Sequence, residues 1–125
     1  MTHAFSRRAL LGAAAFGLLA PPLRAEPKPL RLLAFGDSLI HGYGLAPEES
    51  LPAQLEAALQ RAGHAVTVVN AGNSGDTTAS GLARLDWTLG EPADAVLLAL
   101  GANDGLRGLP PGEMERNLRA IVEGI

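Results

Sequence analysis

The sequence contains no cysteine, only five aromatic residues and little positive charge beyond its first 25 residues. Without cysteine the chain can form no disulfide, no cysteine-ligated zinc site, no iron–sulfur cluster and no thiol nucleophile. The only charged side chains of residues 1–25 are three arginines, so residues 26–125 carry seven basic against thirteen acidic side chains, a net charge of −6. An acidic body of this kind argues against nucleic acid as the main partner.

Cofactor and metal motifs are also missing. Residues 72–77 are rich in glycine but lack the lysine of a phosphate-binding loop, and Gly42-Tyr43-Gly44 lacks the third glycine of a dinucleotide fingerprint. No cluster of His, Asp and Glu has metal-ligand spacing. We therefore expect the protein to use neither a cofactor nor a metal ion.

Residues 1–25 have the pattern of an export signal. Arg7 and Arg8 precede an uncharged apolar stretch from Ala9 to Leu23, which is shorter than the roughly 20 residues of a membrane span. The paired arginines resemble the twin-arginine type of bacterial signal, so we expect a periplasmic or secreted protein, cleaved after Ala25, with no membrane span left. A retained anchor and a buried N-terminal helix are the alternatives.

The remaining residues, 26–125, alternate short apolar runs with amphipathic ones, the pattern of a parallel sheet covered by helices. Right-handed crossovers place the first strand in the middle, as in a flavodoxin-like three-layer αβα sheet that here comprises three βα units within one domain. The predicted strands are Leu30–Phe35, Ala65–Val69 and Ala93–Leu100, and the predicted helices are Leu51–Ala62, Thr77–Leu89 and Glu113–Ile125.

Polar, glycine-rich loops follow all three predicted strands, and the carboxyl ends of parallel strands share one rim of a sheet. Ser38 follows the first strand and can expose its hydroxyl at a helix N-terminus, where it could attack an acyl carbon. The backbone N–H groups of Ser38 and Gly75 and the side-chain amide of Asn103 could together form an oxyanion hole. Taken singly, each residue has a simpler interpretation: a helix-capping serine, a turn glycine and a loop-capping asparagine.

These three loops together resemble the SGNH (GDSL-type) hydrolase superfamily, in particular its bacterial periplasmic arylesterases and thioesterase/lysophospholipases. The first block is Phe35-Gly36-Asp37-Ser38-Leu39, the second runs from Asn70 to Thr77 and the third from Leu100 to Gly108, with Gly-Leu-Ala-Arg-Leu at 81–85 between the last two. The resemblance extends from Leu30 to about Ile125. It implies a serine esterase acting through an acyl-enzyme on carboxylic esters or thioesters, including aryl esters and lysophospholipids.

By this resemblance Ser38 is the nucleophile, and the Ser38 N–H, the Gly75 N–H and the Asn103 side chain hold the oxyanion. Asp37 and Asp104 adjoin the site, and we expect both to support its loops through backbone N–H groups. The family takes its base from an Asp-x-x-His block near the C-terminus, whereas no histidine follows His64 in this chain. We therefore expect the chain by itself to be inactive, although His41, three residues after Ser38, is a possible substitute base.

Two other classes of protein fit part of the pattern. A non-catalytic exported domain could bind an acyl or glycan ligand with the same rim loops, and a flavodoxin-like domain could bind a nucleotide. Leu39, Tyr43 and Leu106 are the candidate apolar walls of a substrate pocket. The sequence selects neither an acyl length nor an oligomeric state.

Overall fold

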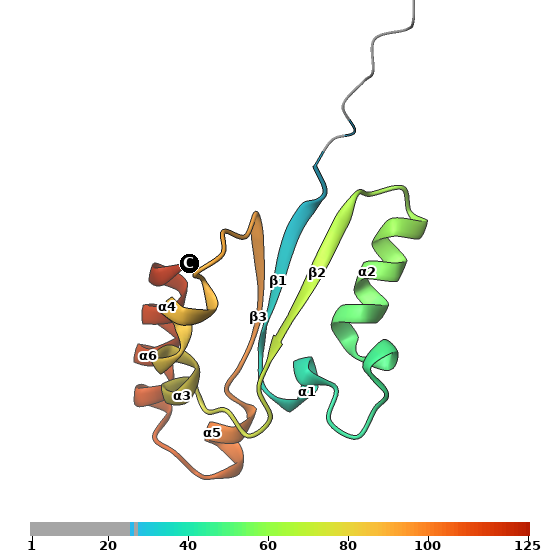
Figure 1. Ribbon diagram of the computed structural model, residues 1–125. Coiled ribbons are helices and arrows are strands. Elements are labelled where there is room, and N and C mark those ends of the chain that lie inside the picture. Colours follow the sequence, from blue (N-terminus) through green and yellow to red (C-terminus); the bar gives the residue numbers. More distant parts are fainter. Residues whose placement is uncertain (1–25, 27) are drawn as a thin grey trace, which may run out of the picture.

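The computed structural model describes Glu26 and residues 28–125, and its centre is a parallel sheet of three strands (Figure 1). The strands are β1 (Leu30–Gly36), β2 (Val66–Gly72) and β3 (Ala95–Ala99). Their order is β2-β1-β3, with both pairings parallel. The predicted fold, with the first strand in the middle, is therefore confirmed. The predicted signal, residues 1–25, lies outside the described residues.

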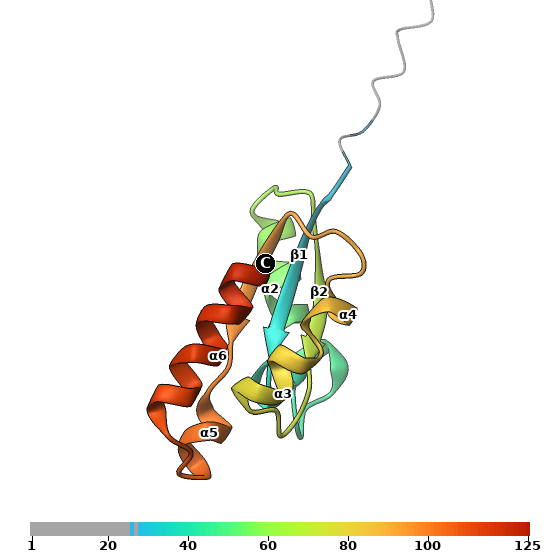
Figure 2. The same ribbon diagram turned by 90° about the vertical axis from the view of Figure 1, so that its left-hand side faces the viewer.

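Helices cover both faces of the sheet and make three layers. One face carries α1 (Ser38–His41) and α2 (Leu51–Arg61), and the other carries α3 (Thr78–Ala83), α4 (Leu85–Thr88) and α6 (Pro111–Gly124) (Figures 1 and 2). A 3-10 helix at Pro47–Glu49 leads into α2, and the short helix α5 (Ala102–Leu106) follows β3. No helix within this described part has the length and apolar character needed to cross a bilayer.

The core lies between the sheet and the α3–α4–α6 layer. Phe35 and Ile121 are fully buried there and Leu85 nearly so. Around them pack half-buried apolar side chains from β2, β3, α3 and the adjoining loops: Ala71, Leu82, Leu89, Val96, Leu98 and Leu100. Because alternate residues of a strand face opposite sides, Phe35 joins this core while its neighbours Ala34 and Gly36 face α1 and α2.

The structure corrects several predicted boundaries. The helix expected over Thr77–Leu89 is interrupted at Arg84, whose φ of −102° and ψ of 2° lie outside the helical range. The Arg84 N–H still donates to the Gly81 carbonyl at 3.2 Å, so α3 continues into α4 within the same helical layer. The second strand continues to Gly72, and the third is shorter than expected, covering only Ala95–Ala99.

Side chains cap the outer edge of β2. Several backbone groups of Val66, Val68 and Gly72 that point away from β1 bind side chains of α1, α2 or β2 itself. Gln60 Nε2 donates to the Val66 carbonyl at 3.0 Å, Glu56 accepts from the Val68 N–H at 2.7 Å, and Asn70 Oδ1 accepts from the Gly72 N–H at 3.0 Å. An unpaired strand edge is a template for pairing with other chains, and here side chains occupy part of that edge.

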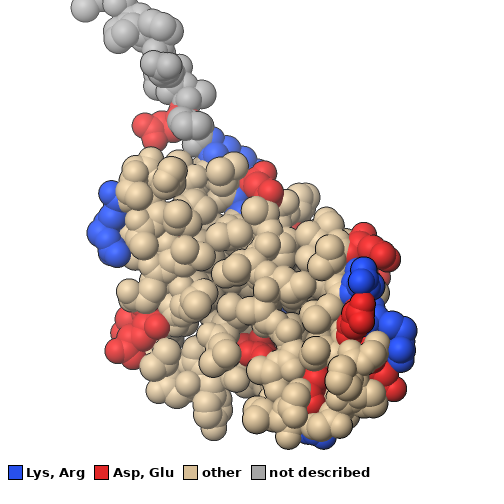
Figure 3. Space-filling view, turned by 180° about the vertical axis from the view of Figure 1, so that it is seen from behind, with Lys and Arg blue, Asp and Glu red and all other residues tan. Residues whose placement is uncertain are grey.

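The opposite edge, at β3, is bare. Within the described residues β3 pairs only with β1, and Leu97 and its neighbours Ala95 and Ala99 are exposed. The view from behind, the side on which β3 lies, shows charged side chains mainly at the margins and only a small acidic spot near the centre (Figure 3). The sheet therefore has one capped and one open edge.

The capping of β2 predicts the effect of removing Glu56. Glu56→Ala leaves the half-buried Val68 N–H without its acceptor, which should lower the free energy of unfolding by about 1–3 kcal/mol. Urea unfolding would measure the change. Glu123→Ala, at an exposed position of α6, is the matched control and should change stability by less than about 0.5 kcal/mol. Equal stabilities of the two variants would contradict the capping role.

Candidate functional site

Ser38 lies at the carboxyl end of β1 as the first residue of α1. Asp37 caps this helix, because its buried carboxylate accepts from the Leu39 N–H at 3.0 Å. The N–H groups at the start of a helix have no acceptor within the helix, and the Ser38 N–H makes no hydrogen bond to any residue that the structure describes. Ser38 therefore offers both a hydroxyl and a free backbone donor at the rim.

Gly36 has a steric reason to be glycine. The register sets it beside Gly72 on one side and Ala99 on the other, so all three strands end together. A Cβ at this position would collide with the Ala99 carbonyl oxygen and with the Ile40 side chain. The glycine of Gly-Asp-Ser-Leu thus lets α1 turn back tightly against the end of the sheet.

The loop after β2 places Gly75 on the same rim. Asn73 donates its N–H to the Gly36 carbonyl at 2.9 Å, which holds this loop against the end of β1. Gly75 has a φ of +88°, a conformation that side chains other than glycine rarely adopt. Its own N–H makes no hydrogen bond to the described residues, while its carbonyl accepts from Arg107 Nη2 at 2.8 Å.

Asn103 and Asp104 join the third loop to the second. Asn103 Nδ2 donates to the Asp76 carbonyl at 2.9 Å, which uses one of its two amide hydrogens. Asp104 is buried and accepts from the Thr78 N–H at 2.8 Å and from the Thr78 hydroxyl at 2.7 Å. Asp37 and Asp104 thus both accept backbone N–H groups at helix starts, which is a loop-holding geometry.

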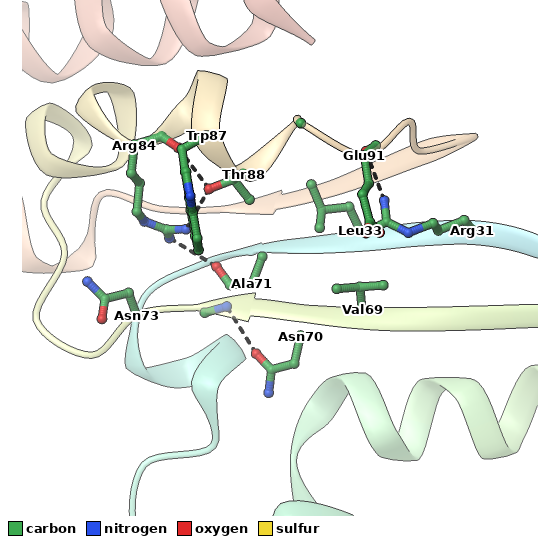
Figure 4. Close-up of a pocket in the computed structure, with 12 residues that line it drawn as sticks. Arg31, Leu33, Val69, Asn70, Ala71, Asn73, Arg84, Trp87, Thr88 and Glu91 are labelled. Atoms are coloured by element: carbon green, nitrogen blue, oxygen red, sulfur yellow. Dashed lines mark hydrogen bonds and ion pairs between the residues drawn. The ribbon is translucent and has the colours of Figure 1, made fainter.

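Arg84 is a site residue that the sequence reasoning missed. Its Nε binds the Asp76 carboxylate at 2.6 Å, and its Nη2 donates to the Gly36 carbonyl at 3.0 Å. The same Nη2 donates to the Ala71 carbonyl at 3.0 Å (Figure 4). The guanidinium also stacks on the Phe35 ring, 4.1 Å from its centroid. Arg84 belongs to the block at residues 81–85 that carried part of the family resemblance. An arginine within a predicted amphipathic helix is normally exposed to solvent, however, so the sequence did not indicate a role in the site.

Neither His41 nor His64 makes a hydrogen bond to the Ser38 hydroxyl. His41 lies on α1, and its exposed ring places Nδ1 3.3 Å from the Gly72 carbonyl. His64 is exposed just beyond α2, near the amino end of β2, at the far end of the sheet. The Ser38 hydroxyl makes no hydrogen bond to any described residue.

A groove of about 860 Å³ runs beside the rim, between β2 and α4. Leu33, Val69 and Ala71 line its floor, and Arg84 and the exposed Trp87 line its wall (Figure 4). Asn73 reaches its end, but Ser38, Gly75 and Asn103 do not line it. The predicted pocket walls Leu39, Tyr43 and Leu106 are all exposed. Among the residues described, no group of three His, Asp or Glu side chains could hold a metal ion.

Comparison with known proteins identifies the family. Residues 34–125 match the GDSL-like lipase/acylhydrolase family, and the chain belongs to it. It is 46% identical over 114 residues to an arylesterase of Vibrio mimicus, covering 90% of this chain and 56% of that protein. It is 43% identical over 95 residues to thioesterase 1/protease 1/lysophospholipase L1 of Escherichia coli K12, covering 75% of this chain and 44% of that protein.

A solved structure shows the same fold. The esterase AlinE4 of the SGNH-hydrolase family superposes with a TM-score of 0.74 at 47% identity, over 79% of this chain and 54% of AlinE4. The chain spans about half the length of the relatives it matches.

Proposed function

We propose that this chain is the nucleophile-bearing part of an exported serine esterase. Residues 1–25 act as a twin-arginine signal, and residues 26–125 form the first part of the hydrolase domain. The observation that carries the proposal is the hydrogen bond from Asn103 to the Asp76 carbonyl. It ties the third rim loop to the second, directly beside Gly75, on the rim where Ser38 begins α1.

The chemistry assigned to these residues is acyl transfer. Ser38 Oγ attacks the carbonyl carbon of the ester, its proton passes to a base, and the carbonyl oxygen becomes an oxyanion. The alcohol or thiol leaves with that proton, which gives an acyl-serine. Water then attacks the acyl-serine in the same way, releasing the carboxylic acid and restoring the Ser38 hydroxyl.

The oxyanion is held by the Ser38 N–H, the Gly75 N–H and the second amide hydrogen of Asn103. The first two make no hydrogen bond to the described residues, and Asn103 uses only one of its two amide hydrogens there. Preorganised donors of this kind stabilise charge that develops in the transition state. Asp37 and Asp104 act indirectly, by holding the first and third loops.

Carboxylic esters and thioesters are the proposed substrates. The names of two relatives, an arylesterase and a thioesterase/lysophospholipase, support aryl esters, acyl thioesters and lysophospholipids as the classes to test. The exposed apolar side chains of Leu39, Tyr43 and Leu106 provide surface for the acyl or aryl group.

The first test of this proposal uses the chain extended by a C-terminal segment that carries the Asp-x-x-His block. Ser38→Ala should abolish hydrolysis of an aryl acetate without changing the melting temperature, because it removes the nucleophile alone. Asn103→Ala should lower kcat by about 10²–10³, the usual cost of one lost oxyanion donor. Steady-state kinetics of both variants would check this.

Glu123→Ala, at an exposed position near the C-terminal end of α6, is the control and should keep kcat within a few-fold. Full activity of Asn103→Ala would remove Asn103 from the oxyanion hole. Full activity of Ser38→Ala would reject the serine esterase itself. Wild-type protein that binds an acyl ligand without hydrolysing any ester would favour the non-catalytic binding domain instead.

A second test concerns residues 26–125 alone, which we expect to hydrolyse an aryl acetate no faster than about the buffer blank. A serine hydroxyl is a weak nucleophile without a neighbouring base, and His41 is turned toward the Gly72 carbonyl. Ester hydrolysis by this chain and by its His41→Ala variant would be compared. Activity that is lost in His41→Ala would make His41 the base.

A third test concerns export. The precursor is expected in the periplasm without residues 1–25, and replacing both Arg7 and Arg8 with lysine should block its export, because the twin-arginine signal is read through that pair. Cell fractionation with immunoblotting would locate the protein. Unchanged export of the double-lysine variant would reject the twin-arginine route, while a precursor that stays in the cytoplasm even with both arginines would reject export altogether.

A further inference from the structure

Arg84 contacts the neighbours of all three proposed oxyanion donors. The Gly36 carbonyl, which accepts from Nη2, is two residues before Ser38. The Asp76 carboxylate, which binds Nε, belongs to the residue after Gly75. The main-chain carbonyl of the same Asp76 accepts from Asn103. One side chain therefore links the residues that fix the position of each donor.

Only a guanidinium can make these contacts at once. Its donors lie in one plane and point in different directions, so that Nε meets the carboxylate while Nη2 bridges the ends of β1 and β2. Its flat face meanwhile packs on Phe35 in the core. A lysine ammonium has the same charge but is a single point on a flexible stem, so it cannot hold Asp76 and both carbonyls in one geometry.

The Arg84–Asp76 pair is also withdrawn from water. The Arg84 side chain is 20% exposed and the Asp76 side chain 6%. Asp76 makes a further bond, from Asn73 Nδ2 at 2.7 Å, to the loop that leads to Gly75. These bonds hold the Arg84 and Asp76 side chains in one arrangement, because moving either side chain would leave a buried charge without its hydrogen bonds.

We propose that Arg84 is a positioning residue that sets the spacing of the Ser38, Gly75 and Asn103 oxyanion donors through Asp76 and the ends of β1 and β2. This inference rests on the esterase function proposed above. In this role Arg84 acts through the oxyanion donors and not by contact with the reacting atoms. It acts in the transition state, where a displacement of about 1 Å can cost about 10²-fold in rate.

The chain offers a matched control in Arg31, at the other end of β1. Arg31 also binds two main-chain carbonyls, those of Glu91 and Pro92, and one carboxylate, that of Glu91. Its side chain is 23% exposed, close to the value for Arg84. These contacts hold the segment before β3 at the end of the sheet opposite the rim. Arg31 is therefore an arginine with a structural role only.

The experiment compares Arg84→Lys with Arg31→Lys in the protein extended by the segment that bears the base. Melting temperature, kcat and KM for an aryl acetate are measured, together with inhibition by a boronic acid that forms a tetrahedral adduct on serine. We expect Arg84→Lys to lower kcat by about 10²-fold with KM nearly unchanged. Its inhibition constant for the boronic acid should rise in parallel, whereas Arg31→Lys should alter only the melting temperature.

A second variant, Asp76→Asn, decides the matter if Arg84→Lys fails to fold. It keeps the main-chain carbonyl that binds Asn103 but removes the carboxylate that binds Arg84, so it should also lower kcat. A folded Asp76→Asn enzyme with wild-type kcat, or equal kcat values for Arg84→Lys and Arg31→Lys, would overturn the proposal. Activity that survives Ser38→Ala would instead overturn the esterase function on which it rests.

Discussion

The ion pair between Arg84 and Asp76 is the interaction on which the rim of this sheet depends. Parallel strands that end together leave carbonyl oxygens that can accept further hydrogen bonds. Here the Gly36 carbonyl, which also accepts from Asn73, and the Ala71 carbonyl lie beside the buried Asp76 carboxylate. Arg84 satisfies all of them with one side chain. Without it, the rim would hold an uncompensated buried charge, an arrangement that typically costs several kcal/mol.

The sequence predicted the larger features of the fold because they follow from apolar periodicity. The three apolar runs became β1, β2 and β3, with the first in the middle, and the helix predicted over Leu51–Ala62 is α2, Leu51–Arg61. The rim loops were located for the same reason, since each follows a strand. Ser38, Gly75 and Asn103 all lie in the segments that directly follow the strands, but their catalytic roles remain proposals.

The features that could not be predicted depend on contacts between distant residues. Leu82, Leu85 and Leu89 have helical spacing, so nothing local indicated the break at Arg84, which allows its side chain to reach Asp76 and the strand ends. The short helix α5 lies in a stretch rich in glycine and polar residues. The helix is held in place by the hydrogen bond from the Thr78 N–H to Asp104, a residue 26 positions away in the sequence.

The two edges of the sheet differ, and this difference determines which edge can pair with a further strand. In the part of the chain that the structure describes, Glu56, Gln60 and Asn70 bind backbone groups along the edge of β2, whereas the edge of β3 has no such partners, so a further strand would join beside β3. A polypeptide supplied separately would therefore add to this domain at one place and in one order.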